Sequence, residues 1–289
     1  MTDDQAPGPA NPLGRPHVRD WTADLELPVE GRPVRIVRFV LGYEPISENV
    51  SIVGGDPYRI LLEPVTAVAV VFERGWVLLD SGFNIDTIRD KAARGAHFNY
   101  DSYTAVVTPG DPLVDQVAAA GLDWSQLAAC AISHVHLDHT GGLRLLVDGP
   151  PVLMQRAEWE FASTTATLAH AVFPDDYLRD GLDIVLLDGD TQLAAGLTAL
   201  DTRGHTPGHQ SFMIELPDRT IVLACDAADL HENITECRAC GTTSLPEHAD
   251  DARRSIERLN ELNSRDGVEV WPGHDPAWEQ WSTFREQWR

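Results

Sequence analysis

The chain has 289 residues, of which 43% are hydrophobic and 23% charged, a composition typical of a folded globular protein rather than a disordered one. Acidic residues outnumber basic ones by 45 to 22, and a formal charge of -23 argues against a nucleic-acid partner because such a surface repels phosphate. The longest apolar runs, such as residues 67–72, fall far short of the roughly 20 residues of a membrane span, so we expect no membrane partner.

The beginning of the chain is predicted to be a flexible tail. Residues 1–21 are rich in proline and glycine and lack the basic start and apolar core of a secretory signal. We expect one domain from residue 22 to 289. Four cysteines are too few and too scattered for a disulfide framework, which favours a cytoplasmic location. Cys237 and Cys240 have CxxC spacing, but no second pair accompanies them, so we interpret them as loop cysteines.

Short apolar, β-branched runs bounded by turn residues are predicted to be strands. In chain order they span residues 34–41, 65–72, 76–80, 130–133, 151–155, 183–187, 211–216 and 220–225. Helical patterns cover residues 84–94, 111–121 and 250–262. Strands and helices that alternate in this way predict a layered α/β architecture with helices covering sheets.

A dense group of potential metal ligands follows the predicted strand 130–133. In the segment SHVHLDHTGG (133–142), His134, His136, Asp138 and His139 fall within six residues. Alternate side chains of an extended segment share a face, which places His134 beside His136 and leaves Asp138 and His139 on the following turn. Imidazole and carboxylate donors suit zinc and similar divalent ions. The alternative, a set of surface histidines capping a helix, does not account for so dense a group.

Other candidate ligands stand at distant strand ends. His205 and His209 precede the predicted strand 211–216, Asp226 follows the strand 220–225, and His274 follows a short apolar run near the C-terminus. One turn cannot surround two metals, so we expect these loops to complete the site.

Together these segments resemble the metallo-β-lactamase superfamily, whose hallmark is HxHxDH followed by a later histidine, an aspartate and a last histidine. The resemblance covers about residues 34–274, including LLDSG at 78–82, and implies a four-layer αββα sandwich with a dinuclear site at one edge of its two sheets. It implies one metal bound by three histidines, a second metal bound by Asp138 and two histidines, and a bridging aspartate. The residues in that order are His134, His136 and His205; Asp138, His139 and His274; and Asp226. Asp80 and His209 are expected to support these ligands from behind.

Within the superfamily, residues 133–143, 154–162, 204–211 and 272–276 are more similar to the N-acyl homoserine lactone lactonases than to the glyoxalase II, RNase Z or lactamase branches. That similarity implies quorum quenching, with a hydroxide shared by two divalent metals opening the lactone ring. Zinc is the first choice of metal, with iron, cobalt or manganese as alternatives. These lactonases commonly carry a tyrosine three residues after the bridging aspartate, where this chain has Asp229. Asp229 is either a second catalytic residue that orients water or a polar substrate group, or a solvated loop residue.

Two other functions remain open from the sequence: a carboxylic ester or thioester hydrolase on the same metals, and a non-catalytic protein that binds a small ligand. In a hydrolase we expect Asp138 to shuttle a proton as well as to bind metal. Phe98, Tyr100 and Tyr103 either line an acyl groove or pack under a loop or at a dimer contact. The long connection 42–62 is a candidate dimer arm, which makes a homodimer possible.

Overall fold

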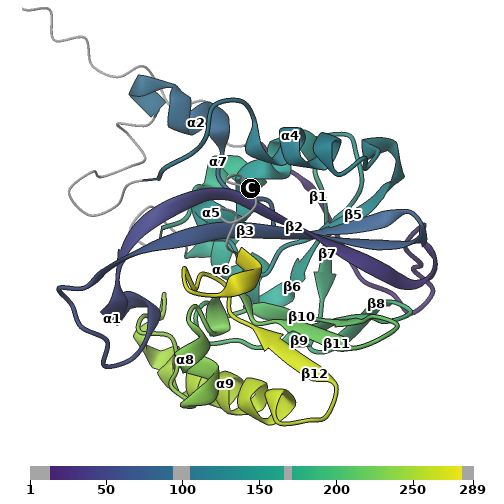
Figure 1. Cartoon of the computed structure of the whole chain (residues 1–289). Helices are drawn as coiled ribbons and strands as arrows, with labels where there is room; N and C mark the ends of the chain where they lie inside the picture. Colours follow the sequence, from purple (N-terminus) through teal and green to yellow (C-terminus); the bar gives the residue numbers. More distant parts are fainter. Residues whose placement is uncertain (1–13, 94–104, 166–170, 282–289) are drawn as a thin grey trace, which may run out of the picture.

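The computed structural model describes residues 14–93, 105–165 and 171–281, whose strands form two sheets that face each other (Figure 1). The strands of the larger sheet are, in spatial order, β1 (His17–Asp20), β7 (Asp183–Leu187), β6 (Val152–Gln155), β5 (Leu127–Ala131), β4 (Trp76–Leu79), β3 (Ile60–Arg74) and β2 (Glu30–Ser47). Those of the smaller sheet are β12 (Val268–Trp271), β11 (Thr220–Leu223), β10 (Gln210–Glu215), β9 (Leu197–Asp201) and β8 (Thr191–Ala194). Neighbouring strands from β4 to β1 pair in parallel, as do β11 and β12, and the remaining pairs are antiparallel.

Helices cover the outer face of each sheet. In Figure 1, α2, α4, α5 and α7 lie over the larger sheet, and α8 and α9 lie over the smaller one. The helices are α1 (Glu48–Ser51), α2 (Ile85–Arg89), α4 (Pro112–Ala119), α5 (Leu137–Thr140), α6 (Arg156–Thr164), α7 (Pro174–Tyr177), α8 (His231–Thr235) and α9 (Ala249–Asn263). No helix in the described part of the chain has the length and hydropathy needed to cross a membrane.

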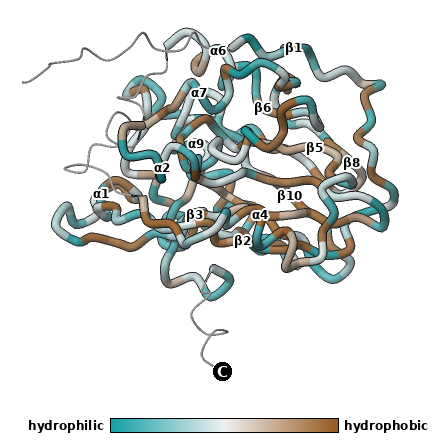
Figure 2. The backbone as a smooth tube through the Cα atoms, turned by 90° about the horizontal axis from the view of Figure 1, so that it is seen from above, coloured by the Kyte–Doolittle hydropathy of each residue, from teal (hydrophilic) through white to brown (hydrophobic). Residues whose placement is uncertain are grey.

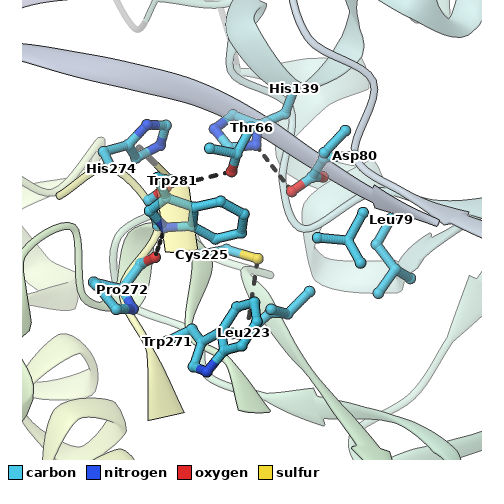
Figure 3. A pocket seen from close by; sticks show the side chains of 13 residues that line it. Thr66, Leu79, Asp80, His139, Leu223, Cys225, Trp271, Pro272, His274 and Trp281 are labelled. Atoms are coloured by element: carbon cyan, nitrogen blue, oxygen red, sulfur yellow. Dashed lines mark hydrogen bonds and ion pairs between the residues drawn. The ribbon is translucent and has the colours of Figure 1, made fainter. Parts of the chain in front are cut away.

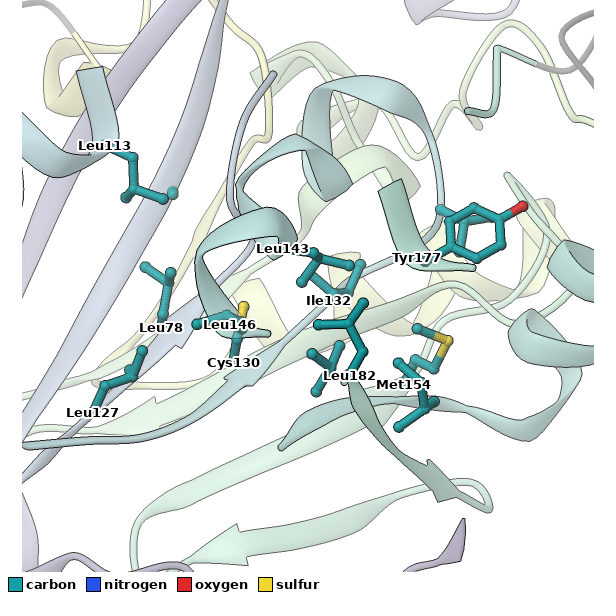
Figure 4. Close-up of a cluster of buried hydrophobic side chains, with 14 of the residues drawn as sticks. Leu78, Leu113, Leu127, Cys130, Ile132, Leu143, Leu146, Met154, Tyr177 and Leu182 are labelled. Carbon is teal, nitrogen blue, oxygen red and sulfur yellow. The ribbon is translucent and has the colours of Figure 1, made fainter. Parts of the chain in front are cut away.

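Three apolar cores separate the four layers. Side chains alternate across β4, so that Trp76 and Leu78 pack under the outer helices while Val77 and Leu79 pack between the sheets. A third core lies between the smaller sheet and α9, which contributes Ile256. Figure 4 shows the outer core of the larger sheet, and Figure 2 shows the hydrophobic strands running through the middle of the molecule. The predicted αββα sandwich is confirmed.

Two of the three predicted helices begin after a capping side chain. The side chain of Asn84 accepts hydrogen bonds from the backbone N–H groups of Asp86 and Thr87, and α2 follows. Asp111 caps α4 in the same way, with Pro112 in the first turn.

Other boundaries differ from the predictions. The segment expected to be a tail contains β1, which pairs with β7 in parallel, and the connection 42–62 is largely the extended end of the β2–β3 hairpin around α1. β5 begins three residues before the predicted strand 130–133. β8 and β9 were not predicted because each contains too few consecutive apolar residues to stand out.

Candidate metal centre

The histidine-rich turn lies where β5 ends and α5 begins. His136 is in an extended conformation immediately before α5, and the turn packs closely against residues 81–84. A Cβ on Gly141 would lie 1.8 Å from the backbone N of Asn84, and one on Gly142 would lie 2.6 Å from the carbonyl O of Ser81. Only glycines allow this contact, which fixes the turn against the end of β4.

Three other segments bring further ligands to this edge. Asp226 lies three residues beyond Leu223, and His274 lies three residues beyond Trp271. Leu223 and Trp271 are partners in the parallel ladder of β11 and β12. That register carries both side chains to the same end of the smaller sheet. His205 enters from the loop between β9 and β10.

The first group of potential ligands comprises His134, His136, His205 and Asp226, whose ligand atoms all lie within 4.8 Å of one another. Asp226 Oδ2 lies 3.5 Å from His134 Nε2 and 3.4 Å from His205 Nε2. His136 Nδ1 lies 3.0 Å from His205 Nε2, while its Nε2 lies 3.0 Å from Ser244 Oγ. The contact with Ser244 leaves Nδ1 as the nitrogen that faces the group.

The second group comprises Asp138, His139 and His274, again within 4.8 Å. His139 Nε2 lies 3.1 Å from Asp138 Oδ2, and His274 Nε2 lies 3.8 Å from the same oxygen. The other carboxylate oxygen of Asp226, Oδ1, lies 3.2 Å from His139 Nε2 and 2.9 Å from His274 Nε2. Asp226 therefore presents one oxygen to each group.

The protonation chemistry of the groups fits cations. Burial, then the nearby His205, lowers the pKa of His136 to about 3, which leaves the neutral imidazole that binds metals. Burial also lowers the pKa of His139, but the carboxylates of Asp138 and Asp226 outweigh it and hold that pKa well above its usual value. The carboxylates are thus stabilised by positive charge beside them. In addition, His134 Nε2 and His139 Nε2 are buried without a hydrogen-bond partner. Divalent ions would satisfy both needs.

The ligand rings are held from behind. His139 Nδ1 lies 3.0 Å from Asp80 Oδ2 (Figure 3). Asp80 Oδ1 accepts a hydrogen bond from the backbone N–H of Ser133 at 2.7 Å. His274 Nδ1 lies 2.9 Å from the carbonyl oxygen of Pro64. Such contacts fix the tautomer of a ligand ring and turn its other nitrogen toward the metal.

His209 lies beside the site without entering either ligand group. Its ring centroid is 5.3 Å from that of His134, and its Nδ1 lies 3.0 Å from Thr202 Oγ1. Its Nε2 is buried without a partner. The supporting role assigned to His209 stays a prediction.

A small cavity of about 20 Å³ lies between the sheets behind His139 and His274 (Figure 3). Its lining includes Thr66, Cys225 and Trp281. The cavity has room for about one water molecule and none for an acyl chain, so it is not the substrate pocket.

Asp229 lies beside the metal centre. Its side chain offers an oxygen within 4.8 Å of ligand atoms of Asp226 and His274, and its backbone carbonyl accepts a hydrogen bond from the N–H of His274 at 2.9 Å. Burial, then the charges of Asp226 and Glu63, raises the pKa of Asp229 well above its usual value. Asp229 is therefore a buried side chain rather than a solvated one, and its role as a second catalytic residue stays a prediction.

Two other features singled out in the sequence have different outcomes. Phe98, Tyr100 and Tyr103 lie outside the described residues. Cys237 is exposed and Cys240 buried, and neither belongs to any group of potential metal ligands found in the described ranges.

Glu158 on α6 connects the two ligand loops and was not identified from the sequence. Its Oε1 accepts a hydrogen bond from the N–H of Val135 at 2.9 Å, between His134 and His136. Its Oε2 accepts from Thr206 Oγ1 at 2.8 Å and from the N–H of Gly208 at 2.9 Å, next to His205. Burial raises the pKa of Glu158 to about 7 against these bonds. The carboxylate thus holds the loop of the first two histidines against that of the third.

We expect Glu158→Gln to weaken metal binding about 10–100-fold, because an amide cannot accept at both ends of this clamp. Metal titration followed by calorimetry measures the change. Glu160→Gln is the matched control, since Glu160 lies on the same helix and is exposed. Unchanged metal affinity in Glu158→Gln would show that the clamp does not position the histidines.

Comparisons with known proteins agree with this geometry. The family model described as the metallo-beta-lactamase superfamily matches residues 61–274, a range that ends at the last candidate ligand. The chain belongs to the metallo-β-lactamase superfamily. The resemblance predicted from the sequence motifs is therefore confirmed, and membership implies a site for divalent metal.

Relatives within the superfamily are named as lactonases. The N-acyl homoserine lactonase AttM of Rhizobium johnstonii is 32% identical over 240 residues, which are 80% of this chain and 88% of the relative. The N-acyl homoserine lactonase AiiA of Bacillus thuringiensis subsp. kurstaki is 27% identical over 223 residues, covering 76% of this chain and 84% of the relative.

A solved structure supports the fold. An N-acyl homoserine lactone hydrolase with N-hexanoyl-L-homoserine at its catalytic metal centre matches with a TM-score of 0.73 and 24% identity over 85% of this chain and 94% of that one.

Proposed function

We propose that this chain is a dinuclear metal-dependent hydrolase that opens the lactone ring of N-acyl homoserine lactones or related lactones, and so quenches quorum signals. The observation that carries the proposal is Asp226, whose two oxygens face two separate groups of potential metal ligands. The names of the relatives, which this chain covers over most of their length, support the lactone as substrate.

The residues divide into two ligand sets around Asp226. His134, His136 and His205 would hold one ion; Asp138, His139 and His274 would hold the other. Two divalent ions held there would supply Lewis-acid chemistry, because they would lower the pKa of a water molecule towards about 7 and polarise the carbonyl of the lactone. Asp80 and the carbonyl of Pro64 would orient the rings of His139 and His274.

Asp138 is the residue we assign to proton transfer. It is buried close to the rings of His139 and His274. Burial alone would raise the pKa of Asp138, but the charge and hydrogen bond of His139, together with the charge of His274, outweigh burial and hold that pKa below its usual value. Its carboxylate is therefore available at neutral pH to take the proton of the attacking water. It would return that proton to the ring oxygen, which leaves as the hydroxyl of the product.

We infer that the ion is zinc. With Asp226 counted in both, the first group offers three imidazoles and one carboxylate, and the second offers two imidazoles and two carboxylates. Zinc accepts both donor sets. Iron, cobalt and manganese accept the same donors. Elemental analysis of protein purified without chelators tests this inference. Fewer than about two transition ions per chain would contradict the dinuclear site.

Turnover of different carbonyl compounds tests whether the substrate is a lactone. The metal-loaded protein would be compared on N-hexanoyl homoserine lactone, a simple γ-lactone, an aryl ester and a thioester, with acid release followed over time. We expect the acyl lactone to be opened with the highest kcat/KM. A preference for the aryl ester or thioester would indicate an ester or thioester hydrolase, and binding without product would indicate a non-catalytic protein.

We also infer self-association through the extended β2–β3 hairpin. Large apolar side chains are exposed along this arm, including Val53, Tyr58 and Ile60. Burying such exposed apolar side chains against a second copy of the chain would favour association. A monomeric molar mass in solution would contradict a homodimer.

A cytoplasmic location agrees with four free cysteines. Fractionation of the native host tests it, and recovery of the protein outside the cytoplasm would contradict it.

A further inference from the structure

A serine outside the ligand loops contacts two histidines of the metal centre. Ser244 lies in the segment 236–245 between α8 and α9, which we call the serine loop. Its Oγ lies 3.0 Å from Nε2 of His136, and its backbone N–H donates a hydrogen bond to the carbonyl oxygen of His205 at 2.8 Å. Both histidines belong to the first group of potential ligands and neither to the second. Ser244 therefore bears on one of the two proposed ions, which we call the first ion.

The ring of His136 is fixed less by packing than the ring of His134. His134 is fully buried, and its Nδ1 lies 3.0 Å from Oγ of the adjacent Ser133. His136 is only partly buried, and its outer nitrogen faces the hydroxyl of Ser244, which lies 108 residues further along the chain. A hydroxyl oxygen that accepts from Nε2–H keeps the neutral tautomer whose Nδ1 is free to bind metal. The contact thus sets both the orientation and the tautomer of this ring.

The serine loop is itself held against α1 on the β2–β3 hairpin. The backbone N–H of Val53 donates to the carbonyl oxygen of Ala239 at 3.1 Å, and Nε of Arg238 donates to the carbonyl oxygen of Val53 at 3.1 Å. A Cβ on Gly241 would lie 2.0 Å from the carbonyl oxygen of Asn49. Only glycine allows the two backbones to approach so closely, so the loop is positioned by this contact.

Buried groups fix α1 and the loop to each other. The side-chain amide of Asn233, fully buried on α8, donates at 3.1 Å to the carbonyl oxygens of Ser51 on α1 and Ala239 in the loop. Ile52, next to α1, packs with Leu61 and Leu230 in a small apolar core. Closely packed groups of this kind transmit a displacement rather than absorb it. A shift between α1 and the serine loop would therefore reach Ser244.

The second group of ligands takes its support from other segments. His139 Nδ1 faces Asp80, which follows β4, and His274 Nδ1 faces the carbonyl oxygen of Pro64 on β3. Neither Asp80 nor Pro64 belongs to the serine loop or to α1. A change in the loop should consequently act on the first ion and leave the second in place.

We propose that Ser244 is a positioning residue for the first ion, and that α1 of the β2–β3 hairpin is the support that keeps Ser244 against His136 and His205. The inference rests on the proposed two-metal site. It assigns control over one ion to a part of the chain that supplies no metal ligand.

Metal titration of Ser244→Ala tests the role of the hydroxyl. Metal-free protein is titrated with zinc by calorimetry, and we expect one of the two affinities to fall about 10–100-fold while the other is unchanged. The weakened step should be the one that His205→Ala abolishes. Ser244→Thr, which keeps a hydroxyl, should restore the affinity to within a few-fold of the original. Ser125→Ala is the matched control, because Ser125 is exposed and precedes β5 at the end remote from the ligand turn.

Gly241→Ala tests the support from α1 without altering Ser244. The added Cβ would collide with the carbonyl oxygen of Asn49, so the loop must shift away from α1. We expect the same zinc step to weaken, and the double variant with Ser244→Ala to be no weaker than the single serine variant, because both changes act through one contact. Gly149→Ala is the control glycine, since a Cβ there would meet no atom closer than 3.1 Å.

Cobalt provides a spectroscopic readout independent of affinity. The visible absorption of cobalt reports the geometry of its ligands, so in fully loaded Ser244→Ala the band of the first ion should change and that of the second should not. Circular dichroism establishes that each variant is folded.

The outcomes separate this inference from the proposed function. If the unaltered protein binds fewer than two ions, or opens no lactone, the proposed function fails. If it binds two ions and Ser244→Ala leaves both affinities unchanged, or lowers both equally, only the positioning role of Ser244 fails. If Ser244→Ala acts on one ion but Gly241→Ala acts on neither, the support from α1 is excluded.

Discussion

Asp226→Asn is expected to lower kcat/KM for the lactone by roughly 10³-fold or more and to reduce the metal content below two ions per chain. In the part of the chain that the structure describes, Asp226 is the carboxylate whose two oxygens approach both groups of histidines, so the amide replaces a charged group between them with a neutral one. A loss of several kcal/mol of transition-state stabilisation corresponds to this factor, since about 1.36 kcal/mol changes a rate tenfold.

Steady-state kinetics and elemental analysis of the same preparation measure both effects of Asp226→Asn. Asp218→Asn, on the exposed turn between β10 and β11, is the control that removes an equal charge far from the histidines. If Asp226→Asn retained two tightly bound ions and near-normal turnover, the bridge would not be part of the reaction, whatever the fold.

The metal centre could be predicted from the sequence because four of its potential ligands lie in one short segment. His134, His136, Asp138 and His139 follow a strand directly, so their proximity is local and needs no knowledge of the tertiary structure. The approach of Asp226 and His274 depends instead on the register of β11 and β12, which a single sequence does not specify. Their positions after apolar runs made both residues candidate ligands, and the resemblance to the superfamily assigned each of them a place in the site.

Residues that support the centre were harder to find. Glu158 is one acidic residue in an amphipathic helix, a position that usually faces solvent, and only the packing of α6 against both loops buries it. Glu44 and Glu63 were missed for the same reason, because nothing in the sequence indicates that the β2–β3 hairpin brings them to His274. When partners from distant segments offset the cost of burying a charged side chain, the local sequence pattern does not indicate that the side chain is buried.

Strand boundaries were likewise predictable where the local pattern is strong and were missed where tertiary pairing decides them. Runs such as residues 183–187, buried on both faces of the sheet, were predicted at their observed bounds. β1 combines charged and apolar residues, and it is a strand because β7 offers it an edge to pair with. Tertiary pairing overrode a weak local preference there.

Asp138→Asn is expected to lower kcat for the lactone by about 10²–10⁴, the usual contribution of a positioned acid or base. The amide keeps the shape of the side chain and one oxygen toward His139 and His274, but it cannot take up a proton at neutral pH. We therefore expect the fold, by circular dichroism, to stay unchanged while turnover falls.

The leaving group separates the two roles of Asp138. A lactone expels an alkoxide that needs a proton, whereas an aryl ester or thioester expels an anion that is stable without one. If Asp138 returns the proton, Asp138→Asn should slow the lactone more than the aryl ester at equal metal content. Equal losses would restrict Asp138 to binding metal or accepting the first proton, and near-normal turnover of the lactone would exclude it as a shuttle altogether.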